Sequence, residues 1–196
     1  MNDIAATLAR GHALNHKNAL EAVGALDDPQ LRWRPARSNS IGFNLWHMAR
    51  WADHLASILS TMTPELRERL GASQELWARE GVAKRWRFPT QGLGNVDTGM
   101  GMDEDRSAAL LLPPKDELVA YVSRAFEAAE RALAAVQDED LTRPAELEAS
   151  RVPWLEPSGY GNVGSWIATA LRHEARHLGM IEAIKGAAGM RGTVTV

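Results

Sequence analysis

Apolar residues recur every three or four positions along most of the chain, whereas the strict alternation of a half-buried strand is scarce. Such spacing places apolar side chains on one face of an α-helix. The pattern therefore predicts four long helices, near residues 3–27, 40–59, 113–136 and 162–186. Polar residues that can cap a helix precede three of them: Asn2 or Asp3, Ser38 or Ser40, and Asn162.

The segments between these helices have less regular patterns. Short helical pieces are expected over residues 64–70 and 73–84, and residues 31–40 are expected to form a connector. Residues 88–105, FPTQGLGNVDTGMGMDED, have several glycines and no periodicity. A loop of this kind either covers a pocket or is simply exposed at the surface.

Four long helices with long connections after the second and the third indicate an all-α, up-down four-helix bundle. The second of these connections covers about residues 138–161. A chain of 196 residues suits one domain, so we expect residues 1–196 to form a single unit.

Composition narrows the choice of partners. The net charge is −3, and a nucleic-acid binder usually has a basic face, so no nucleic-acid partner is expected. No apolar run approaches the roughly 20 residues that span a bilayer, and no signal peptide is evident, so we expect a cytoplasmic protein without membrane contact. The sequence has no cysteine. Metal ligands must therefore be His, Asp or Glu, and any reactive thiol must come from a small molecule.

The string His173-Glu174-Ala175-Arg176-His177 matches H-E-x-x-H, the signature of zinc proteases. In the extended form of that signature a third histidine follows six positions after the second, where this chain has Ala183. The chain ends soon afterwards, and no strand is predicted on which a peptide could align. The peptidase interpretation is therefore disfavoured, although two histidines one turn apart remain a possible metal pair.

A third ligand must then lie upstream. His12 and His16 also form an i, i+4 pair, but their neighbours are polar and we expect them to be solvated. His47 and His54 lie two turns apart on one helix, about 10 Å along its axis, so one small site can use only one of them. The surrounding residues favour His47 only slightly.

Two segments resemble helices of the DinB-like bundles. They are SNSIGFNLWHMARWADHL at residues 38–55 and GNVGSWIATALRHEARHLGMIEAIKG at residues 161–186. The segments ELWAREGVAKRWRFPTQGLG and PPKDELVAYV also resemble a subgroup of that family. The resemblance implies a metal bound by a triad, which by position is His47, His173 and His177. Met180 stands where many members have glutamine, so no role of that glutamine is carried over.

The resemblance also implies chemistry. Some DinB-like proteins are thiol-dependent transferases or isomerases that use mycothiol, bacillithiol or a similar thiol. We therefore expect a small-molecule substrate, a low-molecular-weight thiol as cosubstrate, and a divalent metal, with zinc as the first expectation and nickel or iron as alternatives. One alternative is a non-catalytic homodimeric bundle with a structural or absent metal. Another is a metal-dependent hydrolase that uses bound water.

Several side chains near the triad have two possible roles. Asn44, Glu174 and Glu182 either orient an imidazole or make ordinary polar contacts. Arg172 and Arg176 either bind an anionic substrate or lie on the helix surface. Four tryptophans either shape a pocket or pack in the core: Trp46, Trp51, Trp154 and Trp166. No residue is assigned as a general acid or base.

Overall fold

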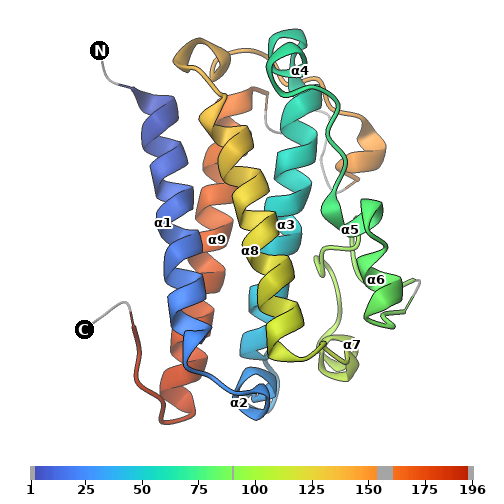
Figure 1. The fold of residues 1–196 in the computed structure, drawn as a ribbon, viewed down its shortest axis with the longest axis vertical. Coiled ribbons are helices and arrows are strands. Elements are labelled where there is room, and N and C mark those ends of the chain that lie inside the picture. The colour runs from blue at the N-terminus through green and yellow to red at the C-terminus, as the bar shows by residue number, and fades with distance from the viewer. Residues whose placement is uncertain (1–2, 90, 154–160, 194–196) are drawn as a thin grey trace.

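The computed structural model describes residues 3–89, 91–153 and 161–193. Four long helices lie side by side and form a bundle (Figure 1). They are α1 (Ile4–Gly24), α3 (Ile41–Met62), α8 (Lys115–Ala134) and α9 (Val163–Ala187). Within the described residues no strand is present, and the predicted all-α four-helix bundle is confirmed.

The path between α3 and α8 differs from simple alternation. In Figure 1, α1 and α9 run downward, whereas α3 and α8 both run upward. The contacts agree with this direction, because the Leu118 side chain near the start of α8 lies beside Gly42 at the start of α3. The chain must therefore return along the length of the bundle between α3 and α8, which explains why that connection is long.

The shorter helices lie in the connections between the long ones. They are α2 (Asp28–Arg32), α4 (Pro64–Leu70), α5 (Leu76–Arg79), α6 (Val82–Arg85), α7 (Glu104–Ala109) and the 3-10 helices η1 (Asp138–Asp140) and η2 (Ala149–Arg151). The helical segment predicted for residues 64–70 is confirmed. The one predicted for residues 73–84 is divided into α5 and α6, because Gly81 adopts a left-handed conformation with φ of 58°.

Local capping explains where the helices begin. The side chains of Asp3, Ser40 and Asn162 each accept a hydrogen bond from a backbone N–H in the first turn, as predicted. The sequence prediction missed α2, which lies partly in the expected connector. Asp27 and Gln30 form a reciprocal capping box that stabilises this single turn.

Helix α3 is the most buried of the four long helices. It packs against both α8 and α9, and α1 packs against the same two helices on the other side. Nearly every residue of α3 is buried, including the fully buried Trp46, Met48 and Leu59. Because buried polar groups need partners, any histidine on α3 must find one inside the protein.

The prediction that His12 and His16 are solvated is wrong. Their exposed fractions are 0% and 1%, because α1 presents both rings to α9 and α8. Glu174 of α9, itself 1% exposed, lies between them: His12 Nδ1 is 2.8 Å from Oε2, and His16 Nε2 is 3.2 Å from Oε1. The second nitrogen of His12 faces the carbonyl oxygen of Ile167, and that of His16 faces Glu130. We call His12, His16, Glu174 and Glu130 the interhelical clasp.

Charge interactions inside the clasp shift two pKa values in opposite directions. Burial disfavours the charged form of His16, but its contacts with Glu174 and Glu130 outweigh this effect and raise its pKa above 6.5. Burial also disfavours the Glu174 carboxylate, yet hydrogen bonds from His12 and His16 keep its pKa below 4.5. The clasp therefore joins three long helices through a charged, hydrogen-bonded contact in the bundle interior.

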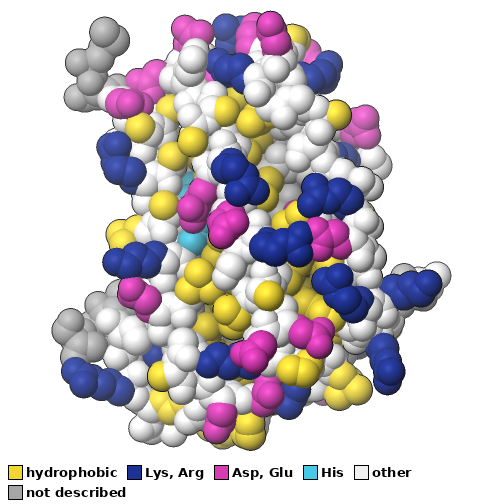
Figure 2. Space-filling view, viewed as in Figure 1, with side chains coloured by type: hydrophobic (Ala, Val, Ile, Leu, Met, Phe, Trp, Pro, Cys, Tyr) yellow, Lys and Arg dark blue, Asp and Glu magenta, His cyan; other side chains and the backbone are white. Residues whose placement is uncertain are grey.

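The face of the molecule shown in Figure 2 has Lys and Arg side chains interspersed with Asp and Glu. Among the described residues, none of the helices combines the length and the apolar character that crossing a membrane requires.

We predict that Glu174→Gln destabilises the metal-free protein by about 3–5 kcal/mol, because it leaves two buried imidazoles without their carboxylate. Urea unfolding in the presence of a chelator measures this difference and separates it from any loss of metal. Glu127→Gln is the matched control on α8. Since Glu127 is 63% exposed, this change should alter the free energy of unfolding by no more than about 0.5 kcal/mol. Equal effects of the two substitutions would contradict a stabilising role for the clasp.

Candidate metal centre

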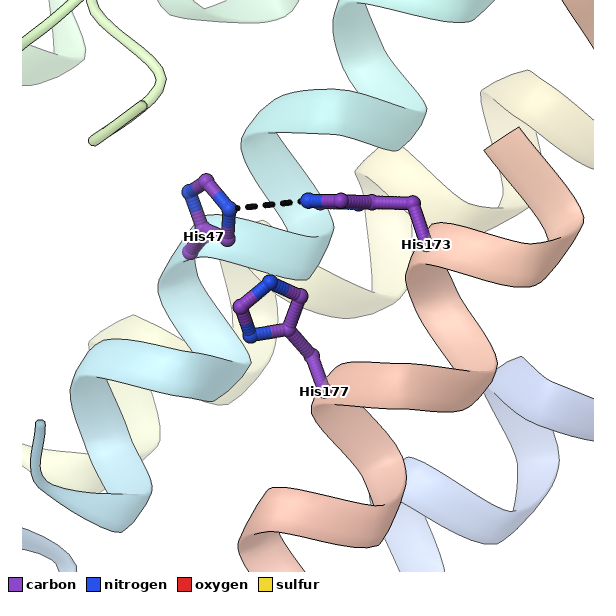
Figure 3. A group of neighbouring side chains, drawn as sticks. All are labelled: His47, His173 and His177. Atoms are coloured by element: carbon purple, nitrogen blue, oxygen red, sulfur yellow. Dashed lines mark hydrogen bonds between the residues drawn. The ribbon is translucent and has the colours of Figure 1, made fainter. Parts of the chain in front are cut away.

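Three histidines from two helices converge in the bundle (Figure 3). His47 lies in the second turn of α3, and His173 and His177 lie one turn apart on α9. The ring centroid of His47 is 4.9 Å from that of His173 and 4.4 Å from that of His177, and the two rings of α9 are 4.5 Å apart. The ligand atoms of the three residues lie within 4.8 Å of one another. The structure thus brings together the triad that the resemblance implies.

Neighbouring acceptors fix the orientation of two rings. His47 Nδ1 donates to the carbonyl oxygen of Thr98, and His177 Nδ1 donates to Asn44 Oδ1 at 2.8 Å. Asn44 is itself held because its Nδ2 donates to the carbonyl oxygen of Ser40 at 2.9 Å. With a proton on Nδ1, each ring has its Nε2 lone pair free for a ligand bond. Of the two roles considered for Asn44, the contact with His177 supports the orientation of an imidazole.

The triad rings are held in their neutral form. Burial, together with the proximity of the other two rings, lowers the pKa of His47 well below 6.5. Burial, with a smaller contribution from Arg176, lowers the pKa of His173 to about 4 and that of His177 to about 3. Metal binding requires neutral imidazole, so these three residues are already in the protonation state of ligands at neutral pH.

The contact between His47 and His173 indicates whether the triad could hold an ion. Their Nε2 atoms are 3.0 Å apart. If both nitrogens have lone pairs, they repel one another unless a proton or a cation lies between them. A divalent cation fits this requirement, and imidazole is a normal ligand of zinc, nickel and iron. The triad is therefore a group that could hold a divalent metal.

The interhelical clasp contains a second set of possible ligands, His12, His16 and Glu174. Each ring nitrogen of this set already faces an oxygen acceptor in the described structure, and the two ring centroids are 6.1 Å apart. Proton-mediated hydrogen bonds satisfy this arrangement without an ion. The triad differs, because His47 Nε2 and His173 Nε2 face one another and not an oxygen acceptor.

His54, the alternative to His47, lies elsewhere. Its Nδ1 is 2.8 Å from Glu75 Oε1, and Glu75 also accepts from the Arg50 side chain at 2.7 Å. Burial would raise the pKa of Glu75, but the contacts with His54 and Arg50 lower it to about 2. His54 therefore belongs to a buried network with Glu75 and Arg50, two turns further along α3 than His47. The other acidic candidate, Glu182, accepts hydrogen bonds from Thr193 near the chain end.

A strap of residues 94–101 closes over His47. Val96 and Asp97 have positive φ values of 44° and 54°, which are unfavourable for residues other than glycine. Arg50 holds this backbone in place, because its Nη2 donates to the Val96 carbonyl at 3.1 Å and its Nε to the Asp97 carbonyl at 2.9 Å. The strap thereby positions the Thr98 carbonyl against His47. The possibility that residues 88–105 cover a pocket is confirmed for this part of them.

Glycine is required where the strap meets the ring. Gly99 has a φ of 88°, and a Cβ atom there would lie 3.0 Å from His47 Nδ1 and 2.8 Å from the Trp46 ring. Sequence reasoning noted the glycines but not the roles of Arg50 and Thr98. A buried arginine three residues after the ligand was the available signal, since it must find acceptors inside the protein.

The triad lines a cavity of about 410 Å³. Its wall is formed by apolar and aromatic residues from α3, the loop between α6 and α7, and α9: Phe43, Trp51, Leu55, Met100, Met102 and Trp166. Arg172 and Arg176 also line it. Two of the tryptophans therefore shape the pocket, whereas Trp46 packs in the core against Trp77 and Phe88. Trp154 lies outside the described residues.

A helical bundle with a histidine triad between its second and fourth long helices is the class that the fold and the site define. The sequence model of the DinB superfamily matches residues 13–181, so the chain belongs to the DinB superfamily. The solved structure of a conserved protein from Enterococcus faecalis has the same fold. It aligns with a TM-score of 0.70 and 14% identity, over 95% of this chain and 99% of that one. No curated protein matches the sequence.

We predict that Asn44→Ala lowers the affinity for a divalent metal by about 10- to 100-fold, because His177 loses the acceptor that fixes its tautomer. Competition with a chromophoric chelator measures the dissociation constant. Asn39→Ala is the control, since Asn39 lines the same cavity without a hydrogen bond to a triad ring among the described contacts. An unchanged affinity in Asn44→Ala would mean that this hydrogen bond does not support the site.

The lowered pKa values also predict how metal affinity depends on pH. Because the folded pKa values of His173 and His177 are about 4 and about 3, protons begin to compete with the metal only as pH falls toward those values. We expect the chelator-measured affinity to stay nearly constant from pH 8 to pH 6, after correction for the chelator's own protonation. Ordinary histidines, with a pKa near 6.5, would lose affinity steeply in this interval.

Proposed function

We propose that this protein is a metal-dependent transferase that uses a low-molecular-weight thiol, such as mycothiol or bacillithiol, as cosubstrate. Three neutral imidazoles that line an apolar cavity are the observation that supports the proposal. Three protein ligands leave at least one coordination position open, which is typical of catalytic rather than structural sites. Zinc is the first choice of metal, with nickel or iron as alternatives.

The absence of cysteine supports the dependence on an external thiol. The chain has no thiol of its own, so a thiol nucleophile must enter the cavity with a cosubstrate. When bound, a divalent ion supplies a positive charge that lowers the pKa of a thiol or a water molecule placed in its open position.

The protein's own residues have three tasks in this proposal. Thr98 and Asn44 hold His47 and His177 in the tautomer that leaves Nε2 free. The aromatic and methionine side chains of the cavity exclude water from the reacting groups. His173 completes the triad from the turn above His177. No side chain of the cavity is assigned as a general acid or base, and a thiol that is already ionised has no need of one.

The test of this proposal begins with metal content. Protein purified without chelator and then offered zinc, nickel or iron should retain about one ion per chain, and His47→Ala and His173→Ala should each lose it. Loaded protein should consume a model electrophile such as chlorodinitrobenzene faster with mycothiol, bacillithiol or glutathione than the thiol alone does. The triad variants should reduce this rate to the uncatalysed level, whereas Arg10→Gln, which removes an exposed arginine from α1, should retain it.

Three outcomes would favour other functions. A protein that retains no stoichiometric ion would exclude the metal-dependent proposal. An ion that accelerates ester or amide hydrolysis without any thiol would identify a hydrolase. An ion that raises thermal stability without supporting any reaction, in a chain that light scattering finds dimeric, would identify a non-catalytic bundle with a structural metal.

A further inference from the structure

The cavity beside the triad has an unbalanced positive charge. Arg172 and Arg176 line it, and the described residues of its wall include no aspartate or glutamate. The chain as a whole has a net charge of −3, so the positive charge is a property of this cavity and not of the protein in general. A bound divalent ion would add to it, because neutral imidazoles do not offset its charge.

The two arginines have no protein acceptor among the described residues. Neither forms an ion pair or a hydrogen bond there, and both are exposed while they line the cavity, so their guanidinium groups are accessible to a ligand. Both line the same cavity as His173 and His177 of the triad. Their positions, one turn apart on α9, place the two side chains side by side along the edge of the cavity.

The remainder of the wall is suited to an apolar group. Phe43, Trp51 and Trp166 present aromatic rings, and Met100 and Met102 of the loop after α6 present flexible thioethers. A cavity of about 410 Å³ is within the range of small-molecule sites. Its occupant therefore needs an apolar body of modest size and a negative group at the edge formed by the arginines.

We propose that the cavity recognises a small molecule with a carboxylate group on an apolar body, and that Arg172 and Arg176 bind the carboxylate. A planar guanidinium forms paired hydrogen bonds with a carboxylate, which gives orientation as well as affinity. The apolar body lies along the aromatic wall, and the opposite end of the molecule reaches the triad. This last placement rests on the proposed function, but recognition of the carboxylate by the arginines does not require the metal.

The test compares a carboxylate with its neutral analogue. Because Trp51 and Trp166 line the cavity, binding of 4-phenylbutanoate and of 4-phenylbutanamide can be followed by tryptophan fluorescence. In metal-free protein we expect the carboxylate to bind about tenfold more tightly than the amide. Arg172→Gln and Arg176→Gln should each reduce this preference, and the double variant should abolish it. Arg10→Gln removes an exposed arginine from α1 and should leave the preference unchanged.

Because binding is measured in metal-free protein, this inference can be tested separately from the proposed function. Equal binding of the two probes, no binding of either, or a preference that persists in the double variant would overturn the inference whatever the metal content. Tight binding of phenyl phosphate without binding of the carboxylate would overturn the assignment of the anion as a carboxylate. A carboxylate preference in a protein that retains no metal would support the inference while the proposed function failed.

Discussion

The site depends on three imidazole rings that face one another without charge inside the bundle. Two of the facing Nε2 atoms are only 3.0 Å apart, a distance that proton-free nitrogens do not keep on their own. The packing of α3 against α9 enforces this distance. Because Thr98 and Asn44 accept hydrogen bonds from the Nδ1 atoms of His47 and His177, the Nε2 atoms of these two rings face the centre of the site. Burial lowers the pKa values of the rings and so keeps them neutral, which is the form that binds a metal ion.

Within five residues, helix α9 contributes side chains to both the triad and the interhelical clasp. His173 and His177 point toward α3, whereas the intervening Glu174 points toward α1 and contacts His12 and His16. Successive helical residues differ by about 100° in direction, so a glutamate next to a ligand histidine faces another part of the interior. The glutamate of this H-E-x-x-H string is therefore occupied in the clasp, while in a zinc protease it would activate water.

The long helices could be predicted because their stabilising pattern is periodic and local, and the caps Asp3, Ser40 and Asn162 are single residues. The choice of His47 over His54 came from the family resemblance and not from periodicity. His12 was misjudged because burial depends on the helix packed against it. The apolar positions Ala5, Ala19 and Val23 on the same face were the available signal. The strap could not be predicted, because its backbone conformation depends on tertiary hydrogen bonds from Arg50.

The parallel course of α3 and α8 has a consequence for how such a protein can diversify. Because both helices run in the same direction, the chain between them has to travel back over the outside of the bundle, and part of it crosses the cavity. Replacement of the part of this segment that carries Met100 and Met102 would reshape the entrance, while α3, α9 and the Thr98 carbonyl kept the ligands in register. New specificities can therefore arise by exchange of one surface segment, with the inner scaffold inherited unchanged.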